Sequence, residues 1–147
     1  MPKLRQRYKI YKAEWATWPW YGSPTPEAAQ GWYDWVARTK WCRDHSPIRH
    51  FRVVYPVFGK LSGVEIDGDT CIIDFGPFSL TWPNMVHELG HPLDYHEGKD
   101  RDAMERDHND VFAGIYLALV KRYISADDAI LLQNEFVKRD VKWIPYI

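Results

Sequence analysis

The middle of the chain shows the two-residue periodicity of β-strands. Apolar side chains stand at alternate positions in the first such stretch: Phe51, Val53 and Tyr55. We therefore expect a strand from about 49 to 57. Two further strands are expected over about 63–66 and 69–75, joined at Asp67-Gly68. That dipeptide favours a type I′ hairpin turn, because both central positions of such a turn need a positive φ.

A helix is predicted before this sheet, over about residues 26–44. Thr25 followed by Pro26 is typical of an N-cap and a first helical position. Apolar residues at helical spacing are expected to face inward: Ala29, Trp32, Val36 and Trp35. The stretch 18–26 is expected to be a loop, because its three prolines and one glycine disfavour regular structure.

Helical periodicity returns in the second half of the chain. We expect a helix that starts near Val86, another over about 103–124, and a last one over about 125–139 with Ser125 as its N-cap. Residues 4–15 fit either a helix or a strand. Three or four strands followed by helices indicate an α+β fold.

The helix near Val86 carries the clearest chemical pattern, His87-Glu88-Leu89-Gly90-His91. Two histidines four residues apart lie on one face of a helix, so both rings can bind the same Zn²⁺ ion. Glu88 lies beside them and can accept a proton from water. A separate apolar stripe is available for the core: Val86, Leu89 and Leu93.

A catalytic zinc site needs a third protein ligand and an open position. The downstream candidates are His96, Glu97, Glu105, His108 and Asp110. In the helix predicted over 103–124, His108 shares one face with Phe112, Ile115 and Leu119, whereas Asp110 lies on the opposite side. We therefore predict His108 as the third ligand. The alternative is a hydrogen-bonded core histidine.

These residues also carry a resemblance. HELGH followed by HNDVFAGIYLALVKRY resembles the SprT-like zincin metallopeptidases. With QRYKIYKAE near the start and SADDAILLQNEF near the end, the chain is similar to a small family of predicted metallohydrolases from actinobacteria and their phages. The resemblance covers most of the chain in order, although only the site motifs are specific. Two departures are Asn109, where the family has glycine, and Pro92, which predicts a kink after His91.

The resemblance implies a zincin-like fold, with a small antiparallel or mixed sheet of three to four strands packed on the H-E-x-x-H helix and two to three further helices. It implies one Zn²⁺ per chain, held by His87, His91 and His108. Glu88 would be the catalytic acid and base. The expected function is that of a zinc metallohydrolase, most simply a peptidase acting on a protein or peptide.

Three further side chains are candidates for supporting roles in this site. Asp94 can hold a ligand histidine through the free ring N–H, as carboxylates around metal sites do. Tyr95 and Tyr116 are near enough in sequence to stabilise an oxyanion.

Two other functions fit the same sequence. In the first, zinc only stabilises an interaction module, such as a phage-encoded modulator of its host. In the second, a SprT-like protease acts on DNA-associated proteins, and a basic N-terminal arm contacts phosphates. The basic residues of that arm are Lys3, Arg5, Arg7, Lys9 and Lys12.

Composition bears on the number of domains, the binding partners and the cellular compartment. The 147 residues suit one domain spanning 1–147, and a net charge of -1 gives no overall attraction to nucleic acid or to a membrane. Without an apolar leader, Cys42 and Cys71 are expected to be reduced thiols of a cytoplasmic protein, in the host cytoplasm if a phage encodes it. The tryptophans between Trp15 and Trp35 suit either core packing or an aromatic surface on which a substrate chain lies.

Overall fold

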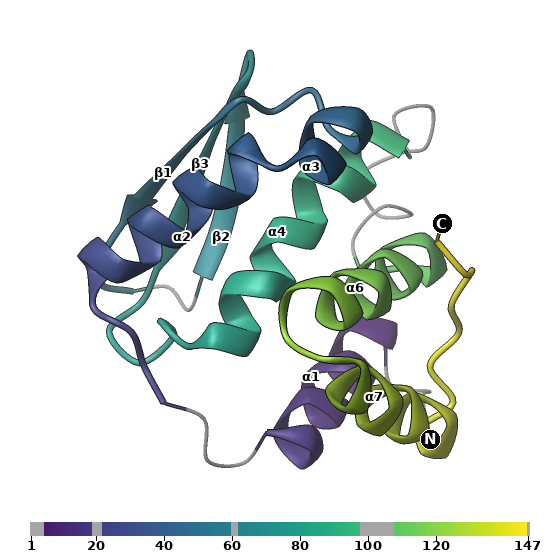
Figure 1. Cartoon of the computed structure of the whole chain (residues 1–147). Coiled ribbons are helices and arrows are strands. Elements are labelled where there is room, and N and C mark those ends of the chain that lie inside the picture. The colour runs from purple at the N-terminus through teal and green to yellow at the C-terminus, as the bar shows by residue number, and fades with distance from the viewer. Residues whose placement is uncertain (1–4, 19–21, 60–61, 98–107, 147) are drawn as a thin grey trace. The chain divides into compact units, whose positions relative to one another are not determined.

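The structure is a computed structural model that describes residues 5–18, 22–59, 62–97 and 108–146, with the side chains of 94–97 left out. The described part is an α+β protein with six helices and a three-stranded mixed sheet (Figure 1), as the order of elements predicts. It divides into two compact units, one over 22–96 and the other from both ends of the chain. The prediction of one domain over 1–147 stays a prediction.

The unit over 22–96 holds the sheet. Its elements are α2 (Pro26–Arg38), α3 (Lys40–His45), β1 (His50–Val54), β2 (Ser62–Asp67), β3 (Thr70–Phe75) and α4 (Trp82–Glu97), whose last residue lies just beyond it. The strand order is β1-β3-β2, with β1 parallel and β2 antiparallel to β3. The central strand alternates buried Cys71, Ile73 and Phe75 with half-buried residues, so one face of the sheet contributes to the core.

The hairpin between β2 and β3 is displaced by one residue from the prediction. Asp67 pairs with Thr70, which leaves Gly68 and Asp69 as the two-residue loop. Gly68 has a φ of 62°, and among the described residues other than glycine only His108 and Asp140 have a positive φ. The type I′ prediction at Asp67-Gly68 is therefore wrong, because glycine occupies only the first central position, as in type II′ turns.

The helix predicted over 26–44 is two helices. Thr25 caps α2 as predicted, since its Oγ1 accepts from the Ala28 N–H at 3.1 Å. Thr39 is extended and ends α2, and its hydroxyl accepts from the Cys42 N–H at 3.3 Å to start α3. A side chain that caps a new helix competes with continuation of the old one. The prediction of a single helix is therefore wrong.

The buried face of α2 also differs in part from the prediction. Ala29 and Val36 are buried, but Tyr33 and Ala37 complete the face, whereas Trp35 is 50% exposed. The Tyr33 hydroxyl donates to the Met85 carbonyl at 2.7 Å, which ties α2 to α4. A buried hydroxyl needs such a partner, and tyrosine supplies a large apolar ring with it.

The H-E-x-x-H helix, α4, begins at Trp82, four residues before the predicted start. The Thr81 hydroxyl accepts from the Asn84 N–H at 3.3 Å, which caps it. The helix continues through Pro92 to Glu97. Four of its apolar residues are almost fully buried: Met85, Val86, Leu89 and Leu93. The predicted apolar stripe is confirmed, and it fixes which way the rest of the helix faces.

The unit formed by the two ends of the chain is helical. It contains α1 (Gln6–Thr17), α6 (Asp110–Tyr123) and α7 (Ala126–Lys138), and α7 packs against both others. The ambiguous stretch 4–15 is thus helical from Gln6. Ser125 caps α7 as predicted, accepting from the Asp128 N–H at 3.0 Å.

The C-terminal segment joins α1 to α6. The Gln6 amide exchanges two hydrogen bonds with the backbone of Lys142, at 2.8 and 3.1 Å. Two residues later, the Ile144 N–H donates to the Asp110 carbonyl at 3.0 Å. Gly114 permits this approach, because a Cβ built there would lie 1.7 Å from the Ile144 carbonyl oxygen.

Cys42 and Cys71 are both free and buried, as expected for thiols without a disulfide. None of the helices in the described part of the chain is long and apolar enough to cross a membrane.

The close approach at Gly114 generates a prediction. Gly114→Ala places a methyl group on a backbone carbonyl, so we expect the protein to lose about 1–3 kcal/mol of stability, or to release the C-terminal segment. Gly31→Ala in α2 is the matched control, because its Cβ would meet nothing within 4 Å. That change should stabilise the helix by about 0.5–1 kcal/mol. Denaturant unfolding of both variants tests this; equal effects would contradict the role of Gly114.

Candidate metal centre

One helix presents the first part of the site. His87, Glu88 and His91 all lie on α4, and the two imidazole rings have centroids 5.2 Å apart with planes at 60°. His87 is 2% exposed and Glu88 is 3% exposed, while His91 is half-buried. The H-E-x-x-H spacing therefore does place two histidines of one helix together, as predicted.

Glu88 is hydrogen-bonded to a residue of the edge strand β2. The Ser62 hydroxyl, at the first residue of β2, donates to Glu88 Oε1 at 2.8 Å. Burial raises the pKa of the Tyr33 hydroxyl well above its usual value, and the charge of Glu88 raises it further. Burial and then Glu88 also raise the pKa of Cys71 to about 12. The nearby tyrosine and cysteine therefore keep their protons at neutral pH.

His108 does not belong to a helix, contrary to the prediction for 103–124. Residues 103–107 lie outside the described part of the chain, and α6 begins only at Asp110. Asn109 is the N-cap, with its Oδ1 accepting from the Phe112 N–H at 2.9 Å. His108 precedes it with a φ of 53°, in the left-handed region that few residues other than glycine adopt. The helical-face argument therefore reached His108 from a wrong premise.

The surroundings of His108 are aromatic. Its ring meets Phe112 edge-on, with centroids 4.9 Å apart, and Tyr11 of α1 with centroids 5.2 Å apart. The Tyr11 hydroxyl lies 3.5 Å from His108 Nε2. His108 itself is 5% exposed. A buried histidine in a strained backbone conformation is typical of functional sites.

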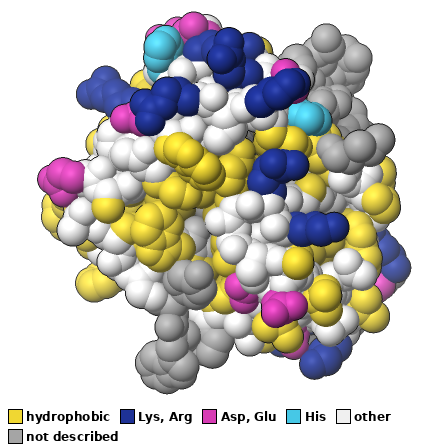
Figure 2. All heavy atoms as spheres, viewed as in Figure 1, with side chains coloured by type: hydrophobic (Ala, Val, Ile, Leu, Met, Phe, Trp, Pro, Cys, Tyr) yellow, Lys and Arg dark blue, Asp and Glu magenta, His cyan; other side chains and the backbone are white. Residues whose placement is uncertain are grey.

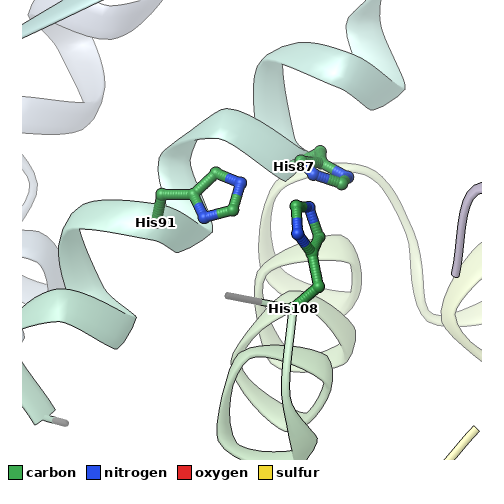
Figure 3. A group of neighbouring side chains, drawn as sticks. All are labelled: His87, His91 and His108. Carbon is green, nitrogen blue, oxygen red and sulfur yellow. The ribbon is translucent and has the colours of Figure 1, made fainter. Parts of the chain in front are cut away.

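The three predicted histidines form a group that can bind a metal ion. One ring nitrogen from each of His87, His91 and His108 lies within 4.8 Å of the others, and Figure 3 shows the rings turned toward one another. Zn–N bonds of about 2.0–2.1 Å place two ligand nitrogens of a tetrahedral site about 3.4 Å apart, so binding would draw the three rings closer together. Three neutral imidazoles are a donor set that suits zinc and other late transition metals.

The other predicted site residues lie outside the histidine group or outside the described side chains. Asp110 is not among the grouped ligands; its Oδ1 accepts from the Val111 N–H at 2.9 Å at the start of α6. Tyr116 is fully buried, with its ring against Phe112 and Trp18, and its role in the site stays a prediction. Five others fall outside the side chains that the structure describes: Asp94, Tyr95, His96, Glu97 and Glu105.

Two residues beside the site were not predicted, Ser62 and Tyr11. Each contacts a site residue far away in sequence, 26 residues for Ser62 and 97 for Tyr11. A lone serine at the start of a strand carries no sequence signal of its own. Tyr11 lies inside the QRYKIYKAE segment, which the family resemblance singled out. That segment was the one sequence signal that could have pointed to Tyr11.

Comparison with protein-family models, with curated proteins and with solved structures finds no match to this chain.

The histidine group predicts metal binding that depends on all three rings. The purified protein should hold about one divalent transition-metal ion per chain, measured by elemental analysis. His108→Ala should weaken that binding by more than the 10–100-fold that loss of an outer hydrogen-bond partner costs. His50→Ala is the matched control, because His50 is exposed on β1 and is not in the group. Equal affinities of the two variants would exclude His108 as a ligand.

Proposed function

We propose that the protein is a zinc-dependent hydrolase, most simply a peptidase, with a zincin-like arrangement of its site. The observation that carries the proposal is the grouping of His87, His91 and His108, together with a buried glutamate directly after the first histidine. Three protein ligands leave one position for a reactant, as in catalytic zinc sites, whereas structural sites use four.

The chemistry can be assigned to particular groups. Bound zinc would supply a Lewis acid that polarises a carbonyl and activates water. Glu88 accepts a proton from the attacking water and passes it to the leaving amine. Ser62 holds one oxygen of that carboxylate at 2.8 Å, so the carboxylate is oriented before the substrate arrives. Such preorganisation removes part of the entropic cost of the step.

The sheet supports a peptide as the substrate. In the described sheet β2 is an edge strand, because β3 lies between it and β1. An extended peptide can pair with an exposed edge through backbone hydrogen bonds. Ser62 begins β2 and bonds to Glu88, so a peptide on this edge would pass beside the carboxylate.

Removing the charge of Glu88 tests whether the protein is a hydrolase that uses this carboxylate. Glu88→Gln should retain the metal ion but reduce hydrolysis of an unfolded protein or a fluorogenic peptide mixture by about 10²–10⁴-fold. Glu27→Gln, an exposed glutamate in the first turn of α2, is the isosteric control and should behave as the parent. If the zinc-loaded parent and Glu88→Gln show the same rate, the non-catalytic zinc-stabilised module is the better explanation.

A second candidate is action on proteins bound to DNA, and one surface favours it. Exposed basic residues gather over α3 and the segments beside it (Figures 1 and 2). We call these residues the α3 basic cluster: Arg38, Lys40, Arg43 and Arg49. Lys40 pairs with Asp44 in this region, and the Arg49 guanidinium donates to the Ser46 carbonyl at 2.6 Å. Clustered arginines are typical of phosphate-binding surfaces.

The α3 basic cluster predicts salt-dependent DNA binding. Replacing Arg38, Lys40 and Arg43 with Gln should weaken binding to a fluorescent duplex and reduce the salt slope by about 0.9 for each phosphate that the variant no longer neutralises. A control with the same charge change replaces Lys121, Arg122 and Lys138, at the ends of α6 and α7. Equal weakening in both variants, or no binding by the parent at about 50 mM salt, would count against this candidate.

A further inference from the structure

Tyr11 contributes a polar group beside His108, the candidate ligand that lies outside α4. It lies in α1, and its hydroxyl is 3.5 Å from His108 Nε2. Its ring meets the imidazole edge-on, with centroids 5.2 Å apart and planes at 71°. A Zn–N bond of about 2.0–2.1 Å is shorter than the 3.5 Å between the Tyr11 hydroxyl and His108 Nε2. If Nε2 binds the ion, the Tyr11 hydroxyl lies just beyond that nitrogen and can reach a group bound beside His108.

Tyr11 also lines an open cavity. The cavity has a volume of about 580 Å³ and is lined by Tyr8, Tyr11, Lys12, Trp15, Ala16 and Arg139. Its walls are mainly apolar, and Trp15 is 78% exposed. Pockets with apolar walls and a few polar groups are the usual form of substrate sites. A substrate side chain in this cavity would bring its neighbouring backbone toward the Tyr11 hydroxyl.

The sequence offered Tyr116 for the role of an oxyanion donor, but its surroundings differ. Tyr116 is fully buried, with its ring 5.9 Å from Phe112 and 6.5 Å from Trp18. Tyr11 is half-buried and borders both the cavity and His108. A donor to a reacting carbonyl must reach substrate, and that requirement favours Tyr11.

We propose that Tyr11 is a catalytic residue whose hydroxyl donates a hydrogen bond to the carbonyl oxygen of the scissile bond. The inference rests on the proposed hydrolase. Water oxygen bonds to the carbonyl carbon, the carbonyl π pair moves onto its oxygen, and Glu88 takes the water proton. Tyr11 stabilises the resulting negative charge without giving up its own proton, and the C–N bond then breaks as Glu88 protonates the amine.

The competing role for Tyr11 is to position His108, and the two roles differ in measurable ways. A donor to the oxyanion acts in the transition state, so its loss lowers kcat and leaves metal affinity unchanged. A residue that only orients a ligand changes metal affinity, typically by about 10–100-fold.

Tyr11→Phe is the decisive variant, with Tyr55→Phe as control. The Tyr55 hydroxyl donates to the Pro77 carbonyl at 3.1 Å, and Tyr55 has no assigned role in the site. In Tyr11→Phe the zinc Kd should stay within about twofold of the parent value, while kcat falls by about 10²–10³-fold. In the cobalt-loaded protein, inorganic phosphate serves as a tetrahedral anion probe. Its affinity, followed by the visible spectrum, should fall by about tenfold or more in Tyr11→Phe only.

Four results would overturn the proposal. The first is a zinc Kd raised by about 10-fold or more with kcat unchanged at saturation, which makes Tyr11 a positioning residue. The second is a phosphate affinity equal to that of the parent. The third is a parent that binds no metal, which also removes the proposed hydrolase. The fourth is a parent that binds metal but hydrolyses nothing, which overturns the hydrolase and the catalytic role of Tyr11 with it. A hydrolytic parent with unchanged phosphate affinity in Tyr11→Phe overturns only the role of Tyr11.

Discussion

Burial of polar groups on α4 is the constraint on which the site depends. His87 and Glu88 are almost inaccessible to solvent, although their neighbours Val86 and Leu89 belong to the apolar core. A buried carboxylate or imidazole costs several kcal/mol unless other groups replace its hydration. Ser62 replaces part of it for Glu88. In the proposed enzyme a metal ion would do the same for the histidine nitrogens, so metal binding and stability would be linked.

The third histidine is placed by backbone conformation rather than by a helix face. His108 takes a left-handed φ directly before the N-cap Asn109. Asparagine is among the best N-cap residues, because its short amide can accept from the N–H three residues on. A glycine at position 109 would leave that hydrogen bond unmade. Asn109 thereby secures the start of α6 beside His108.

Much of the local structure was predictable because its causes are local. Thr25 and Ser125 cap the helices that follow them, and the apolar stripe of α4 is buried. The predictions of helix ends and turns failed where two local conformational preferences compete. Thr39 caps a new helix instead of continuing the old one, and Gly68 takes the first loop position instead of the second. Sequence periodicity does not rank such alternatives, since they differ by about 1 kcal/mol.

By itself the sequence determined the α+β order, the pairing of His87 and His91 on one helix, and the glutamate between them. These follow from short-range geometry, in which residues four apart share a helix face. Only the tertiary structure decided that His108 precedes its helix, that Ser62 holds Glu88, and that Tyr11 lies 3.5 Å from His108. Contacts between residues far apart in sequence depend on how whole elements pack, and periodicity along one segment carries no information about them.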